Sequence, residues 1–245
     1  MRFHVLTLFP ALFPGPLAAS VLGRGMERGV FSLCVHDIRA HGEGRHRVVD
    51  DTPFGGGPGM VMKPGPLAAS VAEAQGEIAD GPAPVVLLDP QGRPLTQAVA
   101  DELAAHPDLV LVCGHYEGVD ERVRENLVTD EISIGDYILT GGELAAMVLV
   151  DAVARRVPGV LGSQESGQAD SFAAGLLQHP QYTRPVEYRG WGVPEVLLSG
   201  NHAEIALWRR RQSLLRTLQR RPELLSHAAL TEEERRWLRD LGWEG

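Results

Sequence analysis

The feature that most constrains the fold is a series of short, almost wholly apolar segments separated by helix-like segments. Residues 84–89 (PVVLLD) and 109–113 (LVLVC) show no alternation of polar and apolar side chains. Strands of this kind are buried on both faces, which is typical of a parallel sheet with helices on its two sides. Residues 2–9, 31–37 and 131–134 are the other predicted strands. The sequence therefore predicts an α/β fold built on a parallel sheet.

Glycine-bearing turns follow three of the predicted strands. They lie at residues 90–92, 114–118 and 135–142, and the last of them leads into a helix-forming segment. Glycine lets the backbone adopt a positive φ or approach a ligand closely. In open parallel sheets, ligands bind beyond the carboxyl ends of the strands. We therefore predict that the three turns line one pocket; three unrelated turns are the alternative.

Helices are predicted between the strands and in the C-terminal third of the chain. Thr96 is a predicted N-cap, and Thr231 with Glu234 forms a capping-box pattern. Residues 39–63 contain the string GGGPGM and are predicted to form a long loop, either functional or solvated. The predicted helices cover residues 17–28, 66–79, 96–105, 120–127, 147–156, 204–221, 222–229 and 231–241.

Composition divides the chain into three parts. Residues 1–161 carry the predicted sheet, and residues 176–245 are predicted to form a small helical domain. Residues 162–175 between them are small, polar and rich in glycine and serine, which predicts a flexible interdomain linker.

Charge is distributed unevenly along the chain. The formal net charge of −9 argues weakly against a nucleic-acid-binding protein. Residues 201–222 nevertheless contain six arginines and one acid, so this predicted helix is a candidate for phosphate contacts, with a solvated helix face as the alternative. The six arginines are Arg209, Arg210, Arg211, Arg216, Arg220 and Arg221.

Cysteine usage and hydropathy predict the compartment. The two cysteines, Cys34 and Cys113, form neither a disulfide framework nor a zinc-binding spacing. No apolar run reaches the roughly 20 residues that span a bilayer, and the N-terminus is predicted to be a strand and not a signal peptide. We therefore expect a cytoplasmic protein that does not associate with a membrane.

The residues alone do not identify a reaction. The sequence lacks a zinc-peptidase helix and a nucleophile elbow, and GGGPGM has neither P-loop nor dinucleotide-binding glycine spacing. Asp170 precedes Ser-Phe-Ala-Ala in the predicted linker. Two interpretations of Asp170 stay open at this point: a solvated loop residue or helix cap, and a general base brought to a substrate when the linker orders.

Eight strings in collinear order over nearly the whole chain carry a resemblance to a known family. They are VDDTPFGGGPGM (49–60), GHYEGVDERV (114–123), SIGDYILTGGELAAM (133–147), PGVLG (158–162), DSFAAGLL (170–177), YTRP (182–185), LLSGNHAEI (197–205) and RRPELL (220–225). With these strings the chain resembles the bacterial tRNA (guanine-N1)-methyltransferases, which belong to the SPOUT class of S-adenosylmethionine-dependent methyltransferases. Together the eight strings are far more specific than any one of them.

The resemblance implies a fold, a cofactor and partners. The implied fold is a parallel α/β domain with a deep trefoil knot, followed by a small helical domain; sequence pattern alone would not suggest a knot, since knots are nearly absent from proteins. The implied methyl donor is S-adenosyl-L-methionine, and the implied partners are tRNA and a second copy of the chain that shares the active site. The residues that the resemblance implies for the donor site are Pro90, Gly114, Tyr116, Glu117, Ile134, Gly135, Asp136, Tyr137, Ile138, Leu139, Gly141 and Gly142.

The resemblance also implies a reaction at N1 of the guanosine at tRNA position 37, which follows the anticodon. Asp170 matches the family's catalytic aspartate, which takes the N1 proton, and Arg155 matches the arginine that stabilises charge on O6, although the adjacent Arg156 allows a one-residue shift. Asp50 and Gly59 match positions near the target guanosine and its 5′ guanosine neighbour. No protein metal site is implied, and whether Mg²⁺ assists the reaction is left open.

Two departures from the family pattern and three other interpretations accompany this one. Asp89 stands before Pro90 where relatives often have a small polar residue, and Ala169 stands before Asp170 where an acid is frequent. The first alternative is a SPOUT methyltransferase acting on another RNA, which the DSFAAGLL and GGGPGM strings disfavour. The others are an RNA-binding protein that keeps the fold without catalysis, and a phosphate- or dinucleotide-binding α/β protein, which lacks its glycine fingerprint.

Overall fold

The computed structural model describes residues 1–162, 170–172 and 174–244 of the chain. The chain forms two compact units, Met1–Gly162 and Ser163–Gly245. Of the predicted linker, residues 163–169 and 173 lie outside the described residues, and Ala169 is among them.

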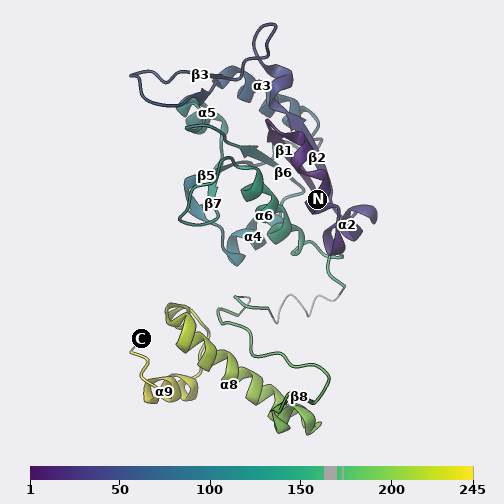
Figure 1. Ribbon diagram of the computed structural model, residues 1–245, viewed down its shortest axis with the longest axis vertical. Helices are drawn as coiled ribbons and strands as arrows, with labels where there is room; N and C mark the ends of the chain where they lie inside the picture. The colour runs from purple at the N-terminus through teal and green to yellow at the C-terminus, as the bar shows by residue number, and fades with distance from the viewer. Residues whose placement is uncertain (163–169, 173, 245) are drawn as a thin grey trace. The chain divides into compact units, whose positions relative to one another are not determined.

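A five-stranded sheet with all neighbouring strands parallel forms the centre of the first unit (Figure 1). Its strand order is β2-β1-β6-β5-β7. The strands are β1 (Arg2–Thr7), β2 (Ser32–Asp37), β5 (Val85–Pro94), β6 (Asp108–Cys113) and β7 (Asp130–Ser133).

The strands β1, β5 and β6 each contribute to two hydrophobic cores, whereas β2 and β7 contribute to one of them. In β6, Leu109 and Leu111 belong to one core, whereas Val110 and Val112 belong to the other. All four side chains are fully buried. The predicted parallel sheet with both faces covered is therefore confirmed, since successive side chains of a strand point to opposite faces.

Helices cover both faces of the sheet. Residues of α2, α4 and α6 pack into the core that contains Leu109, and residues of α3 and α5 pack into the core that contains Val110. The bounds are α1 (Pro14–Leu17), α2 (Ser20–Glu27), α3 (Pro64–Gly76), α4 (Gln97–Ala104), α5 (Glu121–Leu127) and α6 (Glu143–Ala154), with the short 3₁₀ helices η1 (Pro10–Leu12) and η2 (Ile38–His41). The Thr96 hydroxyl caps α4 by accepting a hydrogen bond from Val99 N at 3.3 Å, as predicted.

The structure corrects the prediction at two places in the first unit. Residues 39–63 are not irregular throughout, because they contain η2 and a small antiparallel pair, β3 (Asp50–Asp51) and β4 (Val61–Met62). Residues 90–95 (PQGRPL) do not form only the turn predicted at 90–92, because β5 resumes after an irregularity and both Leu88 and Arg93 pair with Ile132. This second correction rests on backbone pairing between segments distant in sequence.

The second unit is mainly helical. It contains the hairpin β8 (Glu187–Tyr188) and β9 (Trp191–Gly192), η3 (Glu195–Leu198), α8 (His202–Arg220), η4 (Pro222–Ser226) and α9 (Glu232–Asp240). Its core gathers Leu176, Leu214, Leu225, Leu238 and Trp243. Residues 222–229 were predicted as a helix, but the structure has only the 3₁₀ helix η4 there. In the part of the chain that the structure describes, no helix combines the length and the apolar character needed to cross a membrane.

The capping box at the start of α9 is confirmed and is linked to α8 by an ion pair. The Thr231 hydroxyl accepts from Glu234 N, and Glu234 Oε2 accepts from Thr231 N. Arg210 of α8 donates through Nε to Glu234 Oε1 at 2.6 Å and through Nη2 to Oε2 at 3.0 Å. The guanidinium of Arg210, aided by the amide of Thr231, lowers the pKa of the Glu234 carboxyl.

We expect Glu234→Gln to lower the free energy of unfolding of the second unit by about 1–2 kcal/mol at neutral pH, because a partly buried charged hydrogen bond is lost. The pKa of Glu234 is lowered on folding, so its contribution is present above the unfolded pKa of about 4.3 and is lost as the pH falls through the folded pKa. Urea unfolding of both proteins at pH 6 and pH 3.5 measures the difference, which should shrink at the lower pH. Glu232→Gln, an exposed acid of the same helical turn, is the matched control; an equal loss in both variants would contradict the ion-pair explanation.

Candidate functional site

A cavity of about 490 Å³ lies at the carboxyl ends of β5, β6 and β7. Its walls come from the three glycine-bearing turns that the sequence predicts to share a pocket, together with the ends of the strands. Eleven of the twelve residues implied for the donor site line this cavity, and Asp136 is the one that does not. The cavity has the size typical of sites for small ligands.

The first wall is a loop that leaves the sheet and returns to it. Because Leu88 and Arg93 both pair with Ile132, the residues between them bulge away from β7. The Asp89 carboxylate accepts from Gln91 N at 2.9 Å and so closes this loop on itself. Gly92 returns so close to β7 that a Cβ atom there would overlap the backbone of Glu131 and Ile132. A side chain at position 92 is therefore incompatible with this wall.

An ion pair supports the same wall from outside. Arg124 of α5 donates through Nη2 to Asp89 Oδ2 at 2.9 Å, and its Nη1 bonds Glu131 of β7. The side chains of Arg124 and Asp89 are each 12% exposed. Asp89, which departs from the family pattern, therefore has a partner in this chain that fixes its position.

The second wall follows β6. Tyr116 has a φ of +62°, and Gly118 N donates to His115 O at 3.1 Å to form a tight turn. Glu117 N donates to Met60 O at 3.0 Å, which joins this turn to the end of the GGGPGM loop. A Cβ atom on Gly59 would overlap the Glu117 side chain. The structure therefore brings Gly59, an implied tRNA contact, against a residue of the pocket.

The third wall is the segment between β7 and α6. Gly142 N donates to Gly114 O at 2.8 Å, and Gly141 pairs with His115 in an isolated antiparallel bridge. The Tyr137 hydroxyl donates to Ile134 O at 3.2 Å. The second and third walls are thus held together by backbone pairing, which rigidly positions the glycines that face the cavity.

A buried carboxylate that was not among the predicted site residues lies behind this junction. Glu143, the first residue of α6, is 4% exposed and accepts from the Thr7 hydroxyl at 2.8 Å. Its Oε2 lies 3.2 Å from His115 Nε2, and His115 lines the cavity. Because Thr7 and Glu143 are 136 residues apart, only the folded chain reveals the contact; an acid directly after paired glycines was the available sequence signal.

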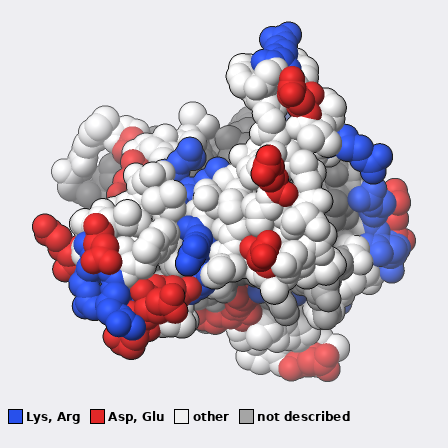
Figure 2. Space-filling model, turned by 90° about the horizontal axis from the view of Figure 1, so that it is seen from below, with Lys and Arg blue, Asp and Glu red and all other residues white. Residues whose placement is uncertain are grey.

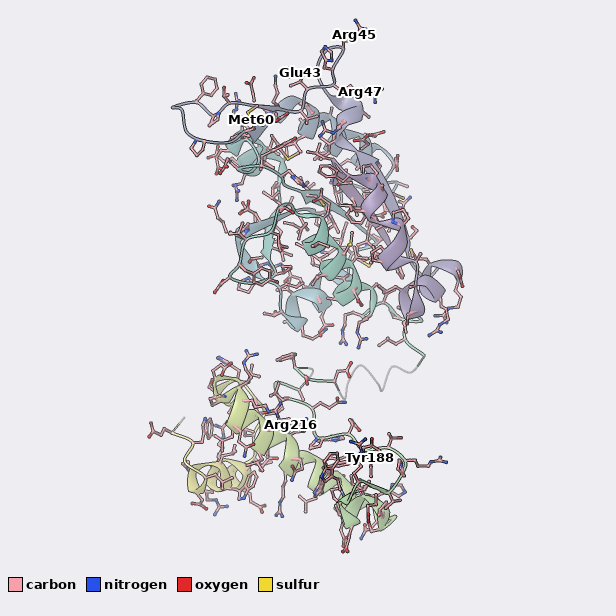
Figure 3. The ribbon with its side chains drawn as sticks, in the orientation of Figure 1. Glu43, Arg45, Arg47, Met60, Tyr188 and Arg216 are labelled. Carbon is pink, nitrogen blue, oxygen red and sulfur yellow. The ribbon has the colours of Figure 1, made fainter. Side chains whose placement is uncertain are left out.

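The long loop of residues 39–63 carries the other implied tRNA residue. Asp50 lies in β3 and pairs with Met62, next to the pocket-facing end of the loop. Glu43 and Val48 close a turn whose tip carries Arg45, and this turn projects from the first unit (Figure 3). Arg45 is exposed, whereas Lys63 at the base is paired with Glu43 at 2.5 Å.

The two implied catalytic residues lie in different units. Arg155 is the C-cap residue of α6 in the first unit. Asp170 belongs to the second unit, in which Leu176 packs with Leu214 of α8 and Leu225 of η4. The Ser171 hydroxyl accepts from Gln178 N at 3.0 Å, Leu177 N donates to the Thr217 hydroxyl at 2.9 Å, and Leu176 is 5% exposed. These contacts anchor Ser171, Leu176 and Leu177 in the second unit.

The six arginines, five in α8 and its C-cap residue Arg221, divide into two groups. Arg210 is paired with Glu234, Arg221 with Glu223, and Arg216 donates to Gln178 O at 3.4 Å. Arg209, Arg211 and Arg220 make no ion pair within the described part of the chain, so they are the better candidates for phosphate contacts. On the face drawn in Figure 2, Lys and Arg side chains of the described residues are interspersed with Asp and Glu.

Comparison with known proteins shows which family the chain is similar to. The family model described as tRNA (Guanine-1)-methyltransferase TrmD matches residues 1–227. A tRNA (guanine-N(1)-)-methyltransferase of Geotalea uraniireducens strain Rf4 is 59% identical over 241 residues, covering 98% of this chain and 97% of the relative. Proteins of the same name from Pelotomaculum thermopropionicum and Chloroflexus aggregans are 58% and 57% identical, and cover 98% and 100% of this chain and 96% and 97% of the relatives, respectively.

Proposed function

The chain belongs to the tRNA (guanine-1)-methyltransferase family, and from this premise we propose that it transfers a methyl group from S-adenosyl-L-methionine to N1 of the guanosine at tRNA position 37. The observation that carries the proposal is the cavity at the carboxyl ends of β5, β6 and β7, which is lined by eleven of the residues that the resemblance implies for the donor. The family match over residues 1–227 supports the choice of tRNA and of the guanine N1 atom.

The cavity suits a donor of this kind. Gly114, Gly141 and Gly142 expose backbone to it, and Ile134 and Leu139 supply apolar walls. The carboxylates of Asp89 and Glu117 also line it and are complementary to a positively charged group. When bound there, S-adenosylmethionine supplies an electrophilic methyl group on a sulfonium.

The chain's own residues provide proton removal and charge stabilisation. Guanine N1 carries a hydrogen and becomes nucleophilic when a base removes it. We assign this step to the Asp170 carboxylate, which would take the proton while the N1 lone pair forms the bond to the methyl carbon and the methyl–sulfur bond breaks, its electron pair staying on the sulfur. Negative charge that spreads to O6 is stabilised by the Arg155 guanidinium. Because N1 lies on the Watson–Crick edge, the base must be unpaired, as bases in a loop are.

A trefoil knot is part of the proposal. Two contacts support it: β7 pairs with β5 on both sides of the bulging loop, and the segment after β7 is tied to the end of β6 through Gly142 and Gly114. These two contacts close loops of backbone. In a knotted chain, a later segment passes through such a loop.

A homodimer with a shared active site is also proposed, because the pocket adjoins exposed apolar side chains. Tyr137 is 54% exposed and Ile138 80% exposed, and on α6 Leu144 is 57% and Val148 47% exposed. Exposed apolar side chains that gather beside a binding site mark surfaces that contact other proteins. In the proposed dimer a second copy covers this surface, and the active site is shared between the two chains. The free thiols Cys34 and Cys113 fit the reducing cytoplasm, which is the proposed location.

Methyl transfer to a pair of tRNA transcripts tests the proposed function. One transcript carries G at the last anticodon position and at its 3′ neighbour, and the other differs only by A in place of the second G. We expect labelling from the methyl-labelled donor in the first transcript alone, because adenosine has no N1 hydrogen to remove. Equal labelling of both transcripts would overturn the proposal and favour a methyltransferase for another RNA site. Donor binding without labelling of either would favour an RNA-binding protein without catalysis.

A further inference from the structure

A second cluster of functional side chains lies in the first unit, between the sheet and the end of α3. It consists of His4 on β1, His36 on β2 and Glu77 at the C-cap of α3. His4 is 0% exposed and His36 is 8% exposed, whereas half of the Glu77 side chain is accessible. In the parallel register His36 pairs with Leu6, two residues beyond His4, so both rings point to the same face of the sheet. Buried histidines facing one another across two strands need an explanation.

The three side chains converge on one point. His4 Nδ1 lies 3.1 Å from His36 Nε2, and Glu77 Oε2 lies 3.7 Å from the first nitrogen and 4.0 Å from the second. In a tetrahedral zinc site with metal–ligand distances of about 2.0–2.2 Å, neighbouring ligand atoms are about 3.3–3.6 Å apart. The observed separations bracket this range, so small side-chain rotations are enough to surround one ion.

The outward nitrogens of both rings face carboxylates. His4 Nε2 lies 3.6 Å from Asp108 Oδ1 and has no hydrogen-bond partner among the described residues. His36 Nδ1 lies 3.9 Å from Glu73 Oε2. Metal-binding histidines commonly direct their second N–H to a carboxylate, which fixes the ring and its tautomer. Asp108 is in turn held by Arg2 Nε at 2.6 Å, and Glu73 by His41 Nε2 at 2.8 Å.

We propose that His4 Nδ1, His36 Nε2 and Glu77 Oε2 bind one zinc ion, with solvent at the fourth position. Two imidazoles and one carboxylate are a donor set for zinc, whereas magnesium and calcium select oxygen ligands. In the absence of an ion, one ring donates to the other at the same 3.1 Å, and His4 Nε2 then has no partner. When the ion is bound, His4 Nδ1 and His36 Nε2 are its ligands, and the other nitrogen of each ring faces a carboxylate.

The position of this site assigns the ion a structural role. The proposed ligands lie on β1, on β2 and at the end of α3, and β1 and β2 form one edge of the sheet. The methyl-donor cavity is lined by residues of β5, β6, β7 and the turns that follow them, and none of the three ligands lines it. The ion would therefore join β1, β2 and α3 without touching the reacting groups, and the inference stands independently of the proposed function.

Calorimetric titration of zinc into the full chain, first freed of metal with a chelator, tests the site. We expect saturable binding of one ion per chain and a rise in the thermal midpoint with zinc concentration, because an ion that binds only the folded state stabilises it. His36→Gln and Glu77→Gln should each weaken zinc binding at least about tenfold, since loss of a ligand costs no less than loss of an outer carboxylate. Glu77 is half exposed, so its variant folds even if a change at the buried histidine does not.

Two control variants keep the test specific. Glu27→Gln removes an acid of α2 outside the cluster, and Cys34→Ser removes the neighbouring thiol on β2; both should bind zinc as the parent chain does. Methyl transfer should be unchanged by zinc in all of these proteins. Absence of saturable binding, or equal affinity in the parent, His36→Gln and Glu77→Gln, would overturn the proposal. Loss of binding in Cys34→Ser would overturn the assigned ligand set.

Discussion

Asp170→Asn is expected to lower the rate constant of methyl transfer by about 10²–10⁴-fold while the donor binds with unchanged affinity. The amide keeps the size of the carboxylate but cannot take the N1 proton, and a positioned general base contributes a factor of this order. Asp170 lies in the second unit, whereas the donor cavity is in the first, so no effect on donor binding is expected. Single-turnover transfer to the tRNA transcript and calorimetry with S-adenosylmethionine measure the two quantities.

Asp240→Asn is the matched control for this variant. Asp240 ends α9 in the same unit, is exposed, and undergoes the same chemical change. The rate constant of methyl transfer by the Asp240→Asn variant should equal that of the parent chain. If Asp170→Asn retained more than about a tenth of the parent rate, the carboxylate would not be the general base.

Gly92→Ala is expected to weaken donor binding by about 100-fold and to destabilise the first unit by about 3 kcal/mol. The added methyl group would overlap the backbone of Glu131 and Ile132, so the loop and β7 must separate. A displacement of about 1 Å at a binding wall is enough for an effect of this size on function. A domain with a net stability of about 5–15 kcal/mol remains folded after this loss.

Gly15→Ala provides the comparison for Gly92→Ala. A Cβ atom on Gly15 would meet no atom within 4 Å, so donor affinity and the urea midpoint should stay close to those of the parent. Equal donor affinity in Gly92→Ala and Gly15→Ala would show that the loop between Leu88 and Arg93 is not a wall of the donor site.

The parts of the fold that could be predicted from sequence are those decided by local pattern. The apolar runs at 84–89 and 109–113 predicted two buried parallel strands. A strand in which polar and apolar residues do not alternate is stable only when both of its faces are buried. Thr96 and Thr231 predicted helix starts because a cap depends only on residues three positions away. The shared pocket followed from the rule that strand ends of a parallel sheet meet at one edge.

The parts that could not be predicted depend on contacts between distant residues. The return of β5 to β7 at Arg93 is fixed by backbone pairing with Ile132, about 40 residues away, and PQGRPL alone resembles a turn. The Thr7–Glu143 bond and the His4–His36 contact join segments whose approach only the complete sheet determines. The residues around Asp170 allowed two interpretations, a solvated loop residue or helix cap and a general base. Only the resemblance to a family favoured the general base.

The most direct test of the account is to mix the two impaired variants, Asp170→Asn and Gly92→Ala, in equal amounts. Asp170→Asn keeps the donor cavity, and Gly92→Ala keeps Asp170, so a mixed dimer with sites shared between chains has one complete site. Random re-association makes half of the dimers mixed, with one active site out of two, so about a quarter of the parent activity should return. Light scattering would verify that dimers form. Mixed dimers without methyl transfer to the transcript would contradict the claim that one chain's Asp170 serves the donor cavity of the other.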